Sequence, residues 1–345
     1  MDPKKFTCVA AAALVTAVPA AFASSAQAAT PTLNGEGSTL VAPLEAEWAT
    51  GWGTATGGDQ VVYQAEGSGD GIKAITARTV DFGASDAPLT PTQQSACNAA
   101  GGTCLTIPWA LSATGVGFNV PGIGSLKLTG KVLAEIYLGQ IKNWDSSAIA
   151  SLNKGEHLPN LAITPIYRSD GSGDSYAFSN YLAHVSSAAK NSIGVSTQPN
   201  FKVGVGAAHN TGMVSTLQST KGGIGYIAVS YLIANKLNAA AVENTAGKFE
   251  YPNLREIEDA ASVVKHASAN AGISIVDPPK IAKIAYPIST FTYAIVPSTA
   301  PQGSLLQSFI RYALGTGQAD GPRLDFAALP KVVKTAALAT VKDIH

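Results

Sequence analysis

The sequence predicts an α/β protein, because strand-like and helix-like segments alternate along it. Its 345 residues can bury a sizeable core and divide into two domains. No low-complexity linker separates such domains, so we expect the chain to cross between them more than once. A hydrophobic share of 46% excludes a disordered chain, and a formal net charge of zero excludes non-specific electrostatic binding of nucleic acid.

The elements follow from residue type and spacing. β-branched and aromatic runs predict buried strands at residues 61–64, 161–167 and 291–296. Apolar residues at helical spacing predict helices around residues 40–48, 72–75 and 178–182. Residues 191–208 are rich in glycine and polar residues, which predicts a long surface loop.

The N-terminus has the pattern of a signal peptide, which we place at residues 1–28. Lys4 and Lys5 precede an apolar stretch over residues 9–23, and Ala26-Gln27-Ala28 offers a cleavage site. The apolar stretch is too short for a membrane span of about 20 residues. Cys8 precedes that stretch, so no lipoprotein cysteine is visible. We therefore expect an exported protein that begins near Ala29.

Export would place the other two cysteines in an oxidising compartment. Cys97 and Cys104 lie close together, and in an oxidising compartment they are expected to form a disulfide that closes a small surface loop. The alternative, a redox or metal site, lacks both the C-x-x-C spacing and nearby histidines. We expect no metal site.

A glycine-rich pattern occurs three times, at residues 35–39, 66–71 and 170–174, each time before a predicted helix. Glycine allows the backbone to approach a ligand closely, and a helix N-terminus offers unpaired N–H groups and the positive end of the helix dipole. Three such loops could surround one oxyanion. The alternative is three ordinary helix N-caps, since Ser, Thr and Asp are favoured there.

Charged residues near these loops narrow the choice of ligand. Arg168 precedes the third loop, and a guanidinium is well shaped for phosphate. The loops also carry carboxylates, which can accept the protons of phosphate but would repel a fully ionised sulfate. These acids therefore indicate a protonated oxyanion; they are Glu36, Glu66, Asp70, Asp86, Asp170 and Asp174.

A secreted phosphate-ester hydrolase is the main alternative of another class. The sequence contains no G-x-S-x-G elbow and no H-E-x-x-H motif, and no partner is evident that would activate Ser68 or Ser172. No Walker lysine follows the glycine loops, and the five histidines are scattered outside them. We therefore expect a binding protein rather than an enzyme.

Seven motifs together resemble the PstS-type phosphate-binding proteins, the receptors of phosphate ABC importers. The motifs occupy residues 35–44, 63–69, 79–89, 136–145, 167–173, 223–226 and 286–288. The resemblance runs from about residue 33 to the C-terminus. It implies the two-lobed periplasmic-binding-protein fold of type II, with phosphate in the cleft between the lobes. On that pattern, lobe I comprises residues 30–115 plus 287–345, and lobe II comprises residues 116–286.

The resemblance also implies a set of phosphate-binding residues. Asp86 matches the carboxylate that accepts a phosphate proton, and Asp170 matches the acidic residue that partly offsets the charge of the arginine. At the position of Asp174 the family often has threonine, so its contact with phosphate is open. The implied binding residues are Thr39, Leu40 (through its N–H), Ser68, Asp86, Arg168, Ser172, Gly173 and Asp174, with Ser38 and Asp170 in support.

The resemblance further implies a monomeric receptor in the periplasm or cell envelope, with no cofactor. Its partners would be phosphate and the permease subunits of an ABC transporter. A receptor for another oxyanion, such as sulfate or molybdate, is the alternative within the same class.

Overall fold

The computed structural model describes residues 30–268, 270 and 272–345, so the predicted signal peptide lies outside the described residues. The strands are β1 (Thr32–Gly37), β2 (Gln60–Gln64), β3 (Phe82–Ser85), β4 (Cys104–Asn119), β5 (Lys127–Leu128), β6 (Thr164–Arg168), β7 (Val205–Ala207), β8 (Gly223–Ala228), β9 (Asn238–Ala239), β10 (Ala241–Glu243), β11 (Phe249–Glu250) and β12 (Ser289–Pro297).

Helices alternate with these strands, as the sequence predicts. They are α1 (Ala42–Thr56), α2 (Ser68–Thr76), α3 (Pro91–Ala99), α4 (Gly130–Tyr137), α5 (Ser147–Ala150), α6 (Gly173–Val185), α7 (Ser187–Ser192), α8 (His209–Ser219), α9 (Val229–Ala234), α10 (Leu254–Ala261), α11 (Gly303–Leu314), the 3₁₀ helix η1 (Thr316–Leu324) and α12 (Lys331–Val341). Within the described part of the chain, no helix has both the length and the apolar character needed to cross a bilayer.

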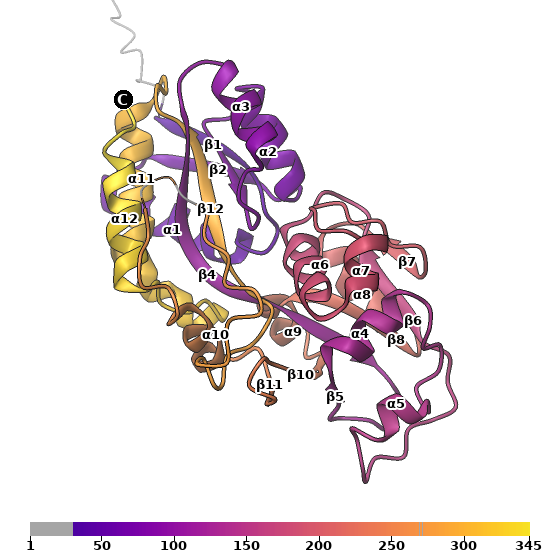
Figure 1. Cartoon of the computed structure of the whole chain (residues 1–345). Coiled ribbons are helices and arrows are strands. Elements are labelled where there is room, and N and C mark those ends of the chain that lie inside the picture. Colours follow the sequence, from indigo (N-terminus) through magenta and orange to yellow (C-terminus); the bar gives the residue numbers. More distant parts are fainter. Residues whose placement is uncertain (1–29, 269, 271) are drawn as a thin grey trace, which may run out of the picture. The chain divides into compact units, whose positions relative to one another are not determined.

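One mixed sheet carries the fold, in the order β2-β1-β3-β12-β4-β8-β6-β7, with β9 beside β4. We call β2, β1, β3 and β12 the first half of this sheet, and β8, β6 and β7 the second half. The shared strand β4 pairs with β12 up to Ala113 and with β8 from Thr114 onward. Figure 1 shows β4 passing from the first half into the second. A single strand therefore belongs to both halves, which is why no linker separates them.

Parallel pairing brings the glycine loops to one place. In the first half, β1 lies parallel to β2 and β3, and in the second half β6 lies parallel to β7 and β8. The carboxyl ends of β1, β2 and β6 lead into α1, α2 and α6. Ligand sites in such sheets lie at the carboxyl ends of the strands. The three helix N-termini therefore lie where a ligand would be expected.

The core beneath the loops contains two clusters of aromatic rings. In the first half, Phe82 and Trp109 meet edge to face with their ring centroids 5.7 Å apart. In the second half, Phe178 and Tyr226 stack with centroids 4.6 Å apart. Aromatic pairs of this kind contribute beyond their buried area and hold a fixed geometry. They provide rigid support for the strand ends that carry the loops.

Three predictions about elements need correction. The strand at residues 61–64 is an edge strand whose Val62 is 49% exposed, because among the described residues no further strand pairs with β2 on its outer side. The strand expected from residue 161 begins at Thr164. Residues 191–208 are not one loop, since they contain the end of α7 and the short strand β7, which pairs with β6. That pairing depends on distant residues, so local composition did not indicate it.

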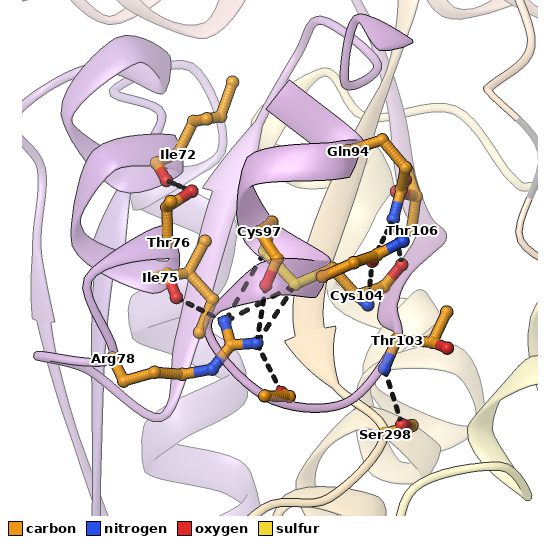
Figure 2. The surroundings of a disulfide bond; sticks show 12 residues. Ile72, Ile75, Thr76, Arg78, Gln94, Cys97, Thr103, Cys104, Thr106 and Ser298 are labelled. Carbon is orange, nitrogen blue, oxygen red and sulfur yellow. Dashed lines mark hydrogen bonds between the residues drawn. A yellow bond between two sulfur atoms is a disulfide. The ribbon is translucent and has the colours of Figure 1, made fainter. Parts of the chain in front are cut away.

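The predicted disulfide is confirmed: Cys97 at the end of α3 is bonded to Cys104 at the start of β4, with Cα atoms 5.9 Å apart. Figure 2 shows the guanidinium of Arg78 beside it. Nη2 of Arg78 donates to the carbonyl oxygens of Cys97 at 2.9 Å and Gly101 at 2.8 Å, and Nη1 lies 3.4 Å from Sγ of Cys104. Arg78 follows the end of α2, and its Nη1 also donates to the carbonyl oxygen of Ile75 on that helix at 2.6 Å, so the arginine connects the loop to α2.

Removing this disulfide should lower stability without changing the fold. The double variant Cys97→Ala, Cys104→Ala is expected to lose about 2.5 kcal/mol of unfolding free energy, the loop-entropy value for a link this short. Urea unfolding followed by circular dichroism measures the loss, and the native spectrum should be retained. Equal denaturation midpoints for the variant and the oxidised native protein would contradict a stabilising role.

Candidate functional site

The three glycine loops meet at one buried centre. A Cβ added to Gly171 would lie 2.9 Å from the Cα of Gly69, so the second and third loops are in backbone contact. Gly69 N–H also donates to the carbonyl oxygen of Gly171 at 2.8 Å. A Cβ on Gly173 would lie 2.4 Å from Oδ2 of Asp86. Only glycine permits this approach between the two halves of the sheet.

Asp86, just after β3, is the carboxylate of the first half, and it is 1% exposed. Oγ of Ser38 lies 2.6 Å from both of its carboxylate oxygens, and Thr292 donates to Oδ1 at 2.7 Å. Ser68 donates to Oδ2 at 3.3 Å. These partners are all hydroxyl groups, so no cation compensates the buried charge directly.

Burial therefore raises the pKa of Asp86 to about 7, with further raising by the charge of Asp174 and partial opposition from the hydroxyl donors. A carboxylate with a pKa near neutrality can share a proton with a ligand that titrates in the same range. Such a pKa suits the role that the family resemblance implies for Asp86, which is to accept a proton from phosphate.

Arg168 ends β6 and is 4% exposed. Its Nε donates to Oδ1 of Asp170 at 2.7 Å, and its Nη2 donates to Oδ2 of the same residue, so this pair is bidentate. Nη1 lies 3.2 Å from both Oγ1 of Thr39 and Oδ2 of Asp174. The guanidinium is thus held in one plane by Asp170, with its other edge directed at the loop of the first half.

Asp174, in the first turn of α6, is 1% exposed and does not face solvent. Its Oδ1 accepts from Oγ1 of Thr114 at 2.6 Å, and its Oδ2 accepts from Nδ2 of Asn210 at 2.8 Å and from Nη1 of Arg168. Burial raises its pKa, and Arg168 opposes that effect. Asp174 therefore has the cationic partner that Asp86 lacks.

The serine hydroxyl groups of the loops also accept hydrogen bonds from backbone N–H groups. Ser68 Oγ accepts from the N–H groups of Asp86 and Gly173, both at 3.1 Å, so its one hydrogen is left for Asp86 or for a ligand. Ser172 Oγ accepts from Ser175 N–H at 3.3 Å as the N-cap of α6. The N–H of Leu40 donates to Oγ of Ser38 at 3.1 Å.

The structure thus brings together most of the residues expected from the sequence. They form two hydrogen-bonded groups. In one, Arg168 contacts Thr39 and Asp174 and is supported by Asp170. In the other, Ser68 contacts Asp86 and Gly173, and Ser38 supports Asp86. Leu40 and Ser172 lie on the same loops. Leu40 contacts these groups through its bond to Ser38, and the hydroxyl of Ser172 caps α6. None of these residues forms a group suited to a metal ion with other described His, Cys, Asp or Glu residues.

Sequence reasoning missed four polar residues of this site: Thr114, Asn210, Tyr226 and Thr292. Tyr226 lay within a quoted motif, and its hydroxyl accepts from the N–H of Arg168 at 2.9 Å. Asn210 is the second residue of α8, the helix that directly follows the segment expected to be a loop. Thr114 and Thr292 lie inside strands, where polar residues between apolar neighbours were the available signal.

The two α/β halves share a strand, and buried hydrogen-bond donors and carboxylates lie where their loops meet. This arrangement is that of a two-lobed binding protein of the periplasmic type. The family model described as a PBP superfamily domain matches residues 23–316. The chain is 34% identical to phosphate-binding protein PstS of Xylella fastidiosa over 89% of this chain and 84% of that protein. It is also 34% identical to PstS of Pasteurella multocida, over 90% of each chain.

The chain therefore belongs to the PstS family of phosphate-binding proteins within the PBP superfamily. A solved structure supports the fold: a high affinity periplasmic phosphate-binding protein, PfluDING, bound with phosphate at pH 8.5. It superposes with a TM-score of 0.72 over 89% of this chain and 93% of that chain, at 22% identity.

Proposed function

We propose that this protein is an extracytoplasmic receptor that binds inorganic phosphate and delivers it to an ABC importer. The observation that carries the proposal is that one site contains both Arg168, a buried cation, and Asp86, a buried carboxylate whose partners are hydroxyl groups and not a cation. The cation favours an anion, and the carboxylate requires that the anion carry a proton. Phosphate meets both requirements at neutral pH, whereas sulfate meets only the first.

Binding residues on this proposal are those that line the meeting point of the loops. Thr39, Ser68, Arg168 and the N–H groups at the start of α6 would donate to phosphate oxygens, and Asp86 would accept a P–OH proton. Ser38 and Asp170 would hold Asp86 and Arg168 in place. The N–H of Leu40 and the hydroxyl of Ser172 would join them as further donors.

Calorimetric titration of the mature chain with phosphate, sulfate and arsenate tests the proposal. At about pH 8 and above, where Asp86 with its pKa of about 7 is ionised, phosphate is expected to bind more tightly than sulfate by orders of magnitude, because sulfate leaves a buried charged acceptor without a donor. Equal affinities for phosphate and sulfate would overturn it.

A receptor should release no product, so a colorimetric phosphate-ester assay separates this function from hydrolysis. Among the described residues no histidine hydrogen-bonds to Ser68 or Ser172, and Ser68 faces Asp86 instead. We therefore propose that the protein is not an enzyme, and turnover of an ester would contradict this.

The proposal extends to location and partners. Export through residues 1–28 would place a monomer in the periplasm or cell envelope, where it would meet the membrane permease subunits without a cofactor. The lobes are proposed at residues 30–115 plus 287–345 and at residues 116–286. The change of partner along β4, between Ala113 and Thr114, supports this division.

Asp174 is expected to give the native protein a binding optimum near neutral pH. With two carboxylates as acceptors, the complex takes up a proton between about pH 8 and 7, because phosphate titrates near neutrality. Affinity should therefore rise as pH falls to about 7 and then decline as Asp86, with its pKa of about 7, becomes protonated.

The variant Asp174→Thr has one acceptor, so it should show no rise on the alkaline side. Phosphate titrations of both proteins between about pH 8 and 6 compare the two profiles. Parallel profiles would show that Asp174 accepts no proton from phosphate.

A further inference from the structure

Asn210 is fully buried at the start of α8 and contacts both halves of the sheet. Its Nδ2 donates to Oγ1 of Thr39 at 2.9 Å and to Oδ2 of Asp174 at 2.8 Å. Its Oδ1 accepts from the N–H of Ala228 at 2.9 Å. Both N–H groups of the amide and its oxygen therefore have hydrogen-bond partners.

These partners fix which way the amide points. A backbone N–H can only donate, so Oδ1 must face Ala228. A carboxylate that also accepts from Arg168 needs a donor, so Nδ2 must face Asp174. Two independent contacts thus give the same orientation, and the amide cannot flip without losing both.

The fixed amide determines the proton direction at Thr39. Oγ1 of Thr39 accepts from Nδ2 of Asn210 and from Nη1 of Arg168, and both of these groups can only donate. A hydroxyl oxygen has two lone pairs, so its hydrogen is left to point elsewhere. Thr39 is thereby a dedicated donor toward an oxyanion between the loops.

The same amide favours the ionised form of Asp174. Three donors reach this carboxylate, from Thr114 on β4, Arg168 on β6 and Asn210 on α8. The other titratable groups that act on it are Asp170 of the same loop, Asp86 after β3, Tyr226 on β8 and Tyr231 on α9. A donor to the charged form lowers a carboxyl pKa, so loss of the amide would raise that of Asp174.

We propose that Asn210 is a specificity-determining positioning residue of this site: its locked amide makes Thr39 a donor and Asp174 an acceptor. The inference rests on the proposed function, since the ligand on which these groups act is phosphate. Asn210 need not touch phosphate. It determines that Thr39 donates and that Asp174 accepts. Because these two residues come from opposite halves of the sheet, recognition of a protonated oxyanion depends on the two halves being together.

The test is titration with phosphate and with sulfate, from about pH 8 to 5.5, of native protein and Asn210→Ala. The variant should bind phosphate roughly tenfold more weakly or worse, the equivalent of one lost hydrogen bond to a charged group. The acid-side decline in affinity should move up by about one pH unit, because Asp174 protonates more readily. The phosphate-to-sulfate ratio should shrink, because a protonated Asp174 can donate to sulfate.

Asn244→Ala is the matched control. Asn244 is also buried, at 5% exposure, but its amide contacts only backbone groups of Lys283, Ala285, Ala246 and Lys248. It should lose stability and keep the native pH profile and selectivity. Asn210→Asp is a second variant of the same shape. Its new carboxyl group should repel Asp174 at high pH, so its phosphate affinity relative to native protein at the same pH should be lowest there and should rise on acidification as the group gains a proton.

The possible outcomes are distinct. If native protein binds phosphate and both Asn210 variants show pH profiles and selectivity parallel to it, Asn210 has only a structural role and the inference is overturned. If Asn210→Ala does not fold, an affinity of Asn210→Asp that rises at low pH relative to native protein supports the inference, and a constant ratio of the two affinities overturns it. If native protein fails to bind phosphate, the proposed function fails first, and this inference fails with it.

Discussion

Asp86→Asn is expected to remove most of the preference for phosphate over sulfate. The native carboxylate accepts from a P–OH group and repels a bare oxygen, whereas an amide can donate to either ligand. Phosphate affinity should fall and sulfate affinity should rise, so the ratio narrows by roughly a hundredfold or more, about 3 kcal/mol of lost discrimination. Calorimetry with both anions measures it. A preserved ratio would show that Asp86 does not read the phosphate proton.

The same variant should change stability in a pH-dependent way without ligand. The pKa of Asp86 is raised to about 7 in the folded protein, against about 3.9 in an unfolded chain. Its burial therefore costs stability increasingly as pH rises from about 4 to 7, and the cost is complete above about 7. Asp86→Asn should melt at a higher temperature than native protein at about pH 8, with the difference vanishing near pH 4. Exposed Asp145 offers the control Asp145→Asn, which should leave both profiles unchanged.

Arg168→Lys is expected to weaken phosphate binding by tenfold or more, about 1.4 kcal/mol. Lysine keeps the charge but cannot reproduce the fork that holds Asp170 through Nε and Nη2 while Nη1 faces Thr39. Stability should also fall, because the buried carboxylate of Asp174 and the partly buried carboxylate of Asp170 lose part of their compensation. Titration below the melting temperature of the variant, with circular dichroism to establish folding, gives the comparison.

The matched control for this change is Arg323→Lys. The side chain of Arg323 is 50% exposed and pairs with Glu47 at 2.6 Å, so its replacement should have little effect on binding or stability. An unaltered phosphate titration curve in Arg168→Lys would show that the guanidinium does not contact the ligand.

Local sequence signals predicted much of the fold. The alternation of elements, the three loop-to-helix transitions and the strand at residues 291–296 are confirmed by β12, α1, α2 and α6. These features depend on backbone propensity and short-range periodicity, which neighbouring residues determine. The failures at β2 and β7 concern which strand lies at the edge and which distant segment pairs with it, and no local pattern encodes either.

For the candidate site, motif recognition found the residues that lie on glycine loops. It did not find Asn210, Thr114 or Thr292, because single polar residues in a strand or at a helix start are common and match no motif. Their importance is visible only as hydrogen bonds to Asp174 and Asp86. A polar residue inside an otherwise apolar strand is the one signal that could have pointed to the two threonines.

By itself the sequence determined the chemical character of the ligand. Glycine loops before helices, one arginine and an excess of carboxylates already indicate an oxyanion that carries protons. Only the tertiary structure decided how the two carboxylates differ. Burial without a cation raises the pKa of Asp86 to about 7, while Asp174 is paired with Arg168 and held by Asn210. Residue identity gives a carboxyl group its ordinary pKa, but the loss of water and the placement of neighbouring charges, which only the folded chain supplies, determine where its proton resides.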